Sequence, residues 1–173
     1  MLRSSSFLYH VAILVVSFVC GVAIFHFVDY EQAKVLIGVV EPRLLQEGKG
    51  TLWHIILPQI GIIAIIFLLA THAFLKYLVR IVAAIRITFF GFSSVFLLQV
   101  ISSIWLYATW WFPFQLVYSM LFLVLCEVLV PTITKKQKVG KGRRFPLQAF
   151  IFVFFLFACV FIVEFIVIST IFK

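Results

Sequence analysis

Charged side chains inside long apolar runs are the residues of this chain that could do chemistry. Outside one short segment between Asp29 and Glu47, the only acids are Glu127 and Glu164, and both lie within apolar runs. Arg86 lies within such a run as well. A charged group near the centre of a bilayer costs at least about 2.5–3.5 kcal/mol, so it faces protein or water, pairs, or changes its protonation state. These residues could therefore join helices or gate a path across a membrane.

The depths of Arg86 and Glu127 allow an ion pair between neighbouring helices. Arg86 lies about nine residues from the inner end of its run, or about 13 Å at 1.5 Å per residue. Glu127 lies about four residues from the inner end of a later run, or about 6 Å deep. The long Arg86 side chain can also reach toward the interface. We predict a structural Arg86–Glu127 pair.

Glu164 has no basic residue nearby in its own run, and it lies about 12 Å from the outer end at the same rise per residue. Candidate partners at a similar depth are His54, Gln59 and Gln115. We favour a structural hydrogen bond to a partner helix; the alternative is a role in transport or gating. Glu127 and Glu164 cannot form an acid–base dyad, because their depths place them near opposite faces.

Enzymatic signatures are absent from the sequence. Asp29 is the only Asp, which excludes intramembrane proteolysis by paired aspartates. No Ser-based hydrolase signature or phosphate-binding glycine loop is present. The isolated cysteines, without CxxC, are typical of small buried apolar residues, and the histidines show no ligand spacing (Cys20, Cys126, Cys159; His10, His26, His54, His72). We therefore expect no enzyme, no metal site and no cofactor.

The composition indicates the elements that must position these residues. Hydrophobic residues make up 65% of the chain and charged residues only 12%, with 22 Phe. A soluble domain has about twice that charged fraction, and a spanning helix needs about 20 mostly apolar residues. The sequence predicts an all-α polytopic membrane protein, a single domain over residues 1–173, with about five spans. These are Phe7–Val28, Leu52–Leu75, Tyr77–Ser102, Pro113–Val130 and Leu147–Phe172.

The distribution of Lys and Arg predicts an N-terminus inside the cell membrane and a C-terminus outside. With that orientation ten basic residues lie inside (Arg3, Lys76, Arg80, Arg86, Lys135, Lys136, Lys138, Lys141, Arg143, Arg144) and four outside (Lys34, Arg43, Lys49, Lys173). The six of the last inner loop, from Lys135 to Arg144, could contact anionic lipid or a cytoplasmic partner, although the positive-inside rule alone explains them. Because the net charge of +8 gathers at span ends, we expect no nucleic-acid binding.

Two further features lie on the outer side. Glu31, Lys34, Gly38 and Glu41 recur at helical spacing, which predicts a short amphipathic helix in the interface, ended by Pro42. This helix could simply shorten the loop, or it could act as a lid or partner-docking face. An uncharged aromatic group is typical of an interfacial belt (Trp105, Tyr107, Trp110, Trp111). The Phe-rich spans show no small-xxx-small pattern that would define a packing face.

Three short stretches resemble the stage II sporulation protein M family of small polytopic membrane proteins. They are Phe90-Gly91-Phe92 with Val95-Phe96-Leu97, Trp111-Phe112-Pro113-Phe114-Gln115, and Val163-Glu164-Phe165. The resemblance implies either a scaffold of an envelope-remodelling complex in sporulating bacteria or a role in producing circular bacteriocins. The compact chain, without a soluble domain, favours the second role.

Three functional hypotheses follow. The first is a non-enzymatic membrane subunit that works with other integral membrane proteins on a hydrophobic peptide during its maturation or export, with a cytoplasmic ATPase as a further candidate partner. The second is a self-contained small transporter or channel gated by Glu164, although no internal repeat is visible in the sequence. The third is an immunity protein that sequesters a toxin peptide at the membrane.

Overall fold

The computed structural model describes residues 2–45, 52–72, 75–100, 104–130 and 147–171. These residues form helices and connecting turns without any strand, which confirms the all-α prediction. The helices are α1 (Leu2–Phe25), α2 (Tyr30–Val40), α3 (Leu52–Thr71), α4 (Val79–Val100), α5 (Ile104–Leu106), α6 (Phe112–Leu129) and α7 (Leu147–Ile171). Two 3-10 turns, η1 (Pro42–Leu44) and η2 (Leu75–Leu78), and a π-helical turn, η3 (Tyr107–Trp111), complete the described chain.

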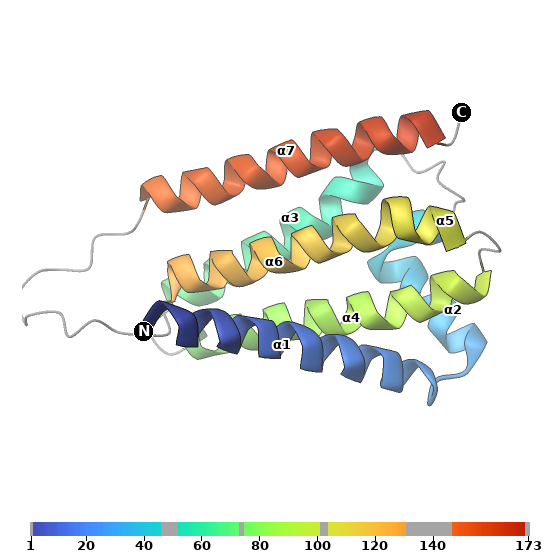
Figure 1. Ribbon diagram of the computed structural model, residues 1–173, viewed down its shortest axis with the longest axis horizontal. Helices are drawn as coiled ribbons and strands as arrows, with labels where there is room; N and C mark the ends of the chain where they lie inside the picture. Colours follow the sequence, from blue (N-terminus) through green and yellow to red (C-terminus); the bar gives the residue numbers. More distant parts are fainter. Residues whose placement is uncertain (1, 46–51, 73–74, 101–103, 131–146, 172–173) are drawn as a thin grey trace, which may run out of the picture.

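Four described helical segments are long and apolar enough to cross a membrane: Leu8–Phe25, Val79–Val100, Ile104–Leu129 and Leu147–Thr170. The second predicted span, Leu52–Leu75, corresponds to α3, whose apolar stretch Ile56–Thr71 is shorter. All five run alongside one another in Figure 1, and α3 leads from the end of the bundle near α2 to the opposite end. The chain is therefore a polytopic membrane protein.

The fourth predicted span begins too late in the sequence. We placed its start at Pro113, but α5, η3 and α6 form one continuous run from Ile104 to Leu129. Pro113 lies in the first turn of α6, directly after the π-helical turn η3, whose wider hydrogen-bond spacing accommodates the missing backbone N–H of proline. The preceding π-helical turn carries the chain into α6, so the proline marks an adjustment within the span and not its beginning.

Helices α1 and α4 approach each other at two glycines. A Cβ atom on Gly21 of α1 would overlap the Thr88 backbone carbonyl, and one on Gly91 of α4 would overlap that of Phe18. Small residues let two helix backbones come this close in a membrane. We predicted no packing face here, although Ser17 and Gly21, both buried, do form a small-xxx-small pair.

Two hydrophobic clusters fill the bundle. One joins α3, α4, α6 and α7, and its large buried side chains include Ile66, Ile87, Phe122 and Phe157. The other lies toward the end that carries α2, which we call the α2 end, and joins α1, α2, α4, η3 and α7 (Phe25, Ala33, Ile37, Leu44, Phe90, Phe92, Phe96, Leu97, Trp110, Trp111, Ile168). The amphipathic α2 is thus packed on the bundle through one of its faces.

Candidate functional site

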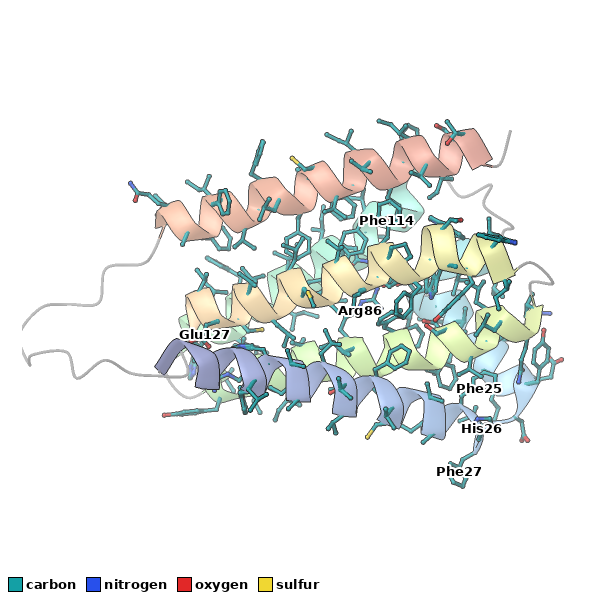
Figure 2. All side chains as sticks on the ribbon, in the orientation of Figure 1. Phe25, His26, Phe27, Arg86, Phe114 and Glu127 are labelled. Atoms are coloured by element: carbon teal, nitrogen blue, oxygen red, sulfur yellow. The ribbon has the colours of Figure 1, made fainter. Side chains whose placement is uncertain are left out.

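A buried ionic contact joins α2 to the centre of the bundle. The Arg86 guanidinium of α4 donates through Nη2 to Glu41 Oε1 at 2.5 Å and to Gln115 Oε1 of α6 at 2.9 Å. All three residues are buried, with 5% or less of each exposed. Figure 2 shows Arg86 between α4 and α6, well inside the bundle. The contact therefore neutralises a charge that would otherwise be costly at this depth.

The local sequence explains how Glu41 reaches Arg86. Glu41 directly follows α2, and its backbone N–H donates to the Ile37 carbonyl at 2.7 Å, which closes the helix. Pro42 disfavours continuation of the helix and starts η1. Ile37 and Leu44 are buried on either side, so the turn between them enters the bundle. The predicted amphipathic helix is confirmed, but the prediction that Glu41 belongs to its polar outer face is wrong.

The predicted Arg86–Glu127 pair is wrong as well. Glu127 instead lies 3.8 Å from Arg80 of α4 and 3.5 Å from His10 of α1. The physical reason is depth: Arg80 comes six residues before Arg86, about 9 Å nearer the end where Glu127 lies. That matching depth was a usable signal in the sequence, whereas no signal indicated that the outer segment folds back to Arg86.

The Glu127 contacts tie three helices together at the end of the bundle opposite α2, where Figure 2 shows Glu127. Arg80 also donates through Nη2 to the Val130 carbonyl at 2.8 Å, and its guanidinium lies 5.8 Å from the centre of the Tyr9 ring. The Glu127 side chain is 31% exposed, so this ion-pair group is only partly buried. The arrangement is suited to fixing helix ends and leaves no buried charge unopposed.

Glu164 is fully buried in α7 and accepts a hydrogen bond from the Tyr118 hydroxyl of α6 at 2.7 Å. The ring of Tyr118 stacks on Phe157, with 6.3 Å between centroids. A hydrogen-bond donor from another helix is present, as predicted, and this donor, Tyr118, is not among the candidates that we named. Gln115 binds Arg86, and the side chain of His54 lies outside the described residues.

Tyr118 could have been found from the sequence, because it follows Gln115 by three residues and thus shares its helix face. It comes nine residues before Glu127 in α6, which separates the two acid contacts by about 14 Å along the helix. Glu127 and Glu164 therefore occupy different levels, as their predicted depths required.

Gln59, the remaining predicted partner of Glu164, lies fully buried in α3. Neither its Oε1 nor its Nε2 has a hydrogen-bond partner in the part of the chain that the structure describes, and the same holds for Gln115 Nε2. Buried amides of this kind are uncommon, because each unmet hydrogen bond carries a desolvation penalty of about 1–3 kcal/mol. The two glutamines therefore hold unused hydrogen-bonding capacity inside the bundle.

The structure is compatible with the predicted aromatic belt for only part of the group. Trp105 is 76% exposed, as an interfacial anchor should be, but Trp110 and Trp111 are buried at 1% and 0%. The two indoles pack edge to face, with 5.9 Å between ring centroids, in the cluster at the α2 end. The π-helical turn that contains them explains the error, since a run of aromatics was read as a connecting loop.

Several predicted residues are not placed by the structure. The six basic residues of the last inner loop lie outside the described residues (Lys135, Lys136, Lys138, Lys141, Arg143, Arg144). Among the residues that are described, no three His, Cys, Asp or Glu side chains gather as metal ligands would. Cys126 is buried, Cys159 is half-buried and Cys20 is exposed, all as free thiols.

The chemistry that these contacts support is the joining of helices. Each of the acids buried or half-buried in the bundle contacts a donor from a different helix: Glu41 contacts Arg86, Glu127 contacts Arg80, and Glu164 contacts Tyr118. A groove of about 280 Å³ between α6 and α7 is lined by apolar side chains and Cys159 (Pro113, Phe114, Val117, Cys159, Val160, Val163).

Comparison with known proteins identifies no relative: no family model, no curated protein and no solved structure matches this chain.

Proposed function

We propose that this chain is a non-enzymatic subunit of a multi-protein assembly in the membrane. The observation that carries the proposal is the contact between Glu164 and Tyr118, which are both fully buried and hydrogen-bonded to each other. A gating carboxylate needs access to a wet path, whereas this one is fully buried and accepts from Tyr118, whose ring packs on Phe157 and Phe161. The contact supports a structural role for Glu164, so we propose that other proteins bind on the outside of the bundle.

One of these surfaces lies on α7. Its exposed side chains are apolar and rich in Phe (Ile151, Phe152, Phe154, Phe155, Ile162, Val163, Phe165, Ile166). Within a bilayer such a face meets either lipid or the helix of another protein. A second apolar surface lies on α2, where a hollow of about 450 Å³ is lined by Glu31, Gln32, Val35, Leu36 and Val39. Together they give the subunit one contact face within the membrane and one at its α2 end.

The resemblance to the stage II sporulation protein M family supports a narrower proposal. It points to the membrane of a bacterial cell and to the maturation, export or immunity of a circular bacteriocin-type peptide. A hydrophobic cationic peptide suits both surfaces, because α2 places Glu31 beside exposed Val35 and Val39. A cytoplasmic ATPase would complete an export assembly, and the basic residues from Lys135 to Arg144 are its proposed contact.

Site-specific photo-cross-linking in the native host tests the proposal. A photoreactive phenylalanine analogue replaces Phe152 or Phe155 on the exposed face of α7, and Val35 on α2. The matched control carries the analogue at Val16 of α1, which is 61% exposed but lies on the helix that is packed through glycines. We expect a discrete cross-linked membrane protein or peptide from α7 or α2. Cross-links to lipid alone at every position would contradict the proposal.

Replacing Glu164 by Gln separates this function from transport. A glutamine keeps an oxygen that can accept from Tyr118, so the variant should give the same cross-links as the unmodified chain. Loss of a proton-coupled flux in purified vesicles, with assembly unchanged, would instead favour a transporter gated by this residue.

A further inference from the structure

The counterion of Arg86 comes from outside the membrane-spanning helices. Glu41 lies in the segment formed by α2 and η1 (Tyr30–Leu44), which we call the α2 segment. An arginine this deep could have been neutralised by an acid on a neighbouring span, but its carboxylate partner arrives on a connecting segment. The Arg86 contact is therefore made or broken by the docking of the α2 segment.

The surroundings of Arg86 have more hydrogen-bonding capacity than Glu41 uses. Gln115 accepts from Arg86 through Oε1, while its Nε2 has no partner among the described residues. Gln59 lies one helical turn before Ile63 in α3, and Gln115 lies one turn before Tyr118 in α6; Ile63 and Tyr118 share a hydrophobic cluster. Each amide thus lies one turn nearer the α2 end than a residue of that cluster, in helices that pack against each other.

The surface beneath the α2 segment is apolar. Ala33, Ile37 and Leu44 belong to the same buried cluster as Phe90 and Trp111. Phe90 lies one turn after Arg86 in α4, and Trp111 lies one turn before Gln115 in α6. Displacement of the segment would therefore uncover aromatic surface immediately beside a cation and an amide.

We propose that Arg86, Gln115 and Gln59 form a binding site for the carboxylate of an amphiphilic ligand, and that Glu41 occupies this site as an intramolecular substitute. Arginine binds carboxylates strongly because its charged N–H groups match their oxygens. The unpartnered amide N–H groups can donate to a ligand that carries more acceptors than one side-chain carboxylate. The apolar surface beneath the α2 segment receives the rest of the ligand, which must be hydrophobic.

Glu41 then controls how tightly the ligand binds. A ligand competes with the docked α2 segment, so its apparent affinity falls by the fraction of molecules in which Arg86 is available. Glu41→Gln keeps the size of the side chain but removes the competing charge. This substitution should therefore tighten the binding of a carboxylate ligand, with little effect on a neutral ligand of the same length.

The experiment measures binding to the full chain in nanodiscs. One arm uses oleate with oleyl alcohol as its neutral counterpart; the other uses a hydrophobic peptide with a free C-terminal carboxylate, compared with its C-terminal amide. In the Glu41→Gln variant we expect at least a tenfold gain for a carboxylate probe and less than a twofold change for its neutral counterpart. Adding Arg86→Gln should abolish the gain, and Asp29→Asn, at the exposed N-cap of α2, should leave binding unchanged.

The two arms identify the source of the carboxylate. A gain for oleate alone assigns the site to a fatty acid, a gain for the peptide alone assigns it to a peptide terminus, and either result supports the site. If Glu41→Gln does not fold, Ile37→Ala replaces it, because truncation of this buried side chain loosens the α2 segment and keeps both charges. No Arg86-dependent gain for either carboxylate in a folded variant would overturn the proposal.

Discussion

The bundle holds its first helix and its last helix in different ways. At Gly21 and Gly91, α1 meets α4 through main-chain atoms, because no side chain lies between the two backbones there. Ring contacts such as Phe18 with Phe90 flank this close approach. α7 meets α6 through the stacked rings of Tyr118 and Phe157 and one buried hydrogen bond to Glu164. The difference teaches that main-chain contact limits the position of α1, whereas α7 is held only by side chains in the contacts described, and side chains can rearrange.

This contrast bears on which flank is available to partners. Backbone contact tolerates almost no displacement, since interiors are close-packed and a small shift loses many contacts at once. The α6–α7 contact leaves an apolar groove of about 280 Å³ between the helices, so packing there is less complete. A helix held by side chains, with a wide apolar face, is the better candidate for a surface that adapts to another protein.

The largest effect is expected from Gly91→Ala or Gly21→Ala. The new methyl group would overlap a backbone carbonyl of the facing helix, which cannot rotate away, so the two helices must separate. Overpacking usually costs about 1–3 kcal/mol, and we expect about 3 kcal/mol or more here because main-chain atoms are involved. The free energy of unfolding in mixed micelles of mild detergent and SDS gives the measurement.

Gly61→Ala is the matched control for these two variants. Gly61 lies in α3, and a Cβ atom there would meet nothing within 4 Å. Alanine is favoured over glycine inside a helix by about 0.5–1 kcal/mol, so this variant should be as stable as the unmodified chain or slightly more so. A similar loss at all three glycines would show that helix propensity, and not close approach of α1 and α4, determines the result.

An intermediate effect is expected from Tyr118→Phe. The substitution keeps the ring that packs on Phe157 but removes the hydroxyl that donates to Glu164, and so leaves a buried carboxyl group without this partner. We expect a loss of about 1–2 kcal/mol, the range found for hydrogen bonds between membrane helices. Glu164→Gln, which keeps an acceptor, should cost less.

A double-mutant cycle isolates the contact itself. If Tyr118 and Glu164 interact as the structure places them, the effects of Tyr118→Phe and Glu164→Leu should not add, because the second change removes a bond already lost. Additive effects would mean that the rings alone hold α7 against α6, and the contrast with the α1–α4 interface would become sharper.

The sequence determines the helices well because long apolar runs and the charge pattern at their ends leave few alternatives. It predicted α2 from the spacing of Glu31, Lys34 and Gly38, and it singled out Arg86 and Glu164 because charge inside an apolar run needs an explanation. These inferences depend on the composition of each segment and on the helical spacing of its residues, and both can be seen in one sequence.

Partner choice was less predictable, because it depends on contacts that are remote in sequence. Its helical spacing from Glu31, Lys34 and Gly38 placed Glu41 on the polar face of an outer helix. The structure instead buries Glu41 against Arg86, which is 45 residues away in the sequence. Tyr118 was not among the predicted partners, because a tyrosine within an apolar run suggests packing of its ring and gives no sign that its hydroxyl donates a hydrogen bond. The glycine contact required knowing which two helices are neighbours, and depth alone does not give that.

The smallest effect is expected where the two regions of the comparison meet. Glu127 on α6 contacts Arg80 of α4 and His10 of α1 at 3.8 and 3.5 Å. Its side chain is 31% exposed, and exposed ion pairs stabilise proteins by less than about 1 kcal/mol, so Glu127→Gln should cost no more than that. The loss should also shrink at high salt, which screens such charges.

Salt dependence therefore distinguishes Glu127 from the other two contacts. The close approach of α1 and α4 at Gly91 and the hydrogen bond at Glu164 are both buried. The effects of Gly91→Ala and Tyr118→Phe should therefore be the same at low and high ionic strength. A loss above about 2 kcal/mol for Glu127→Gln, unaffected by salt, would mean that the Glu127 contacts behave as a buried ion pair and not as an exposed one. In that case Glu127 would itself be the main link between α1 and α6, and the two flanks could not be treated as separate interfaces.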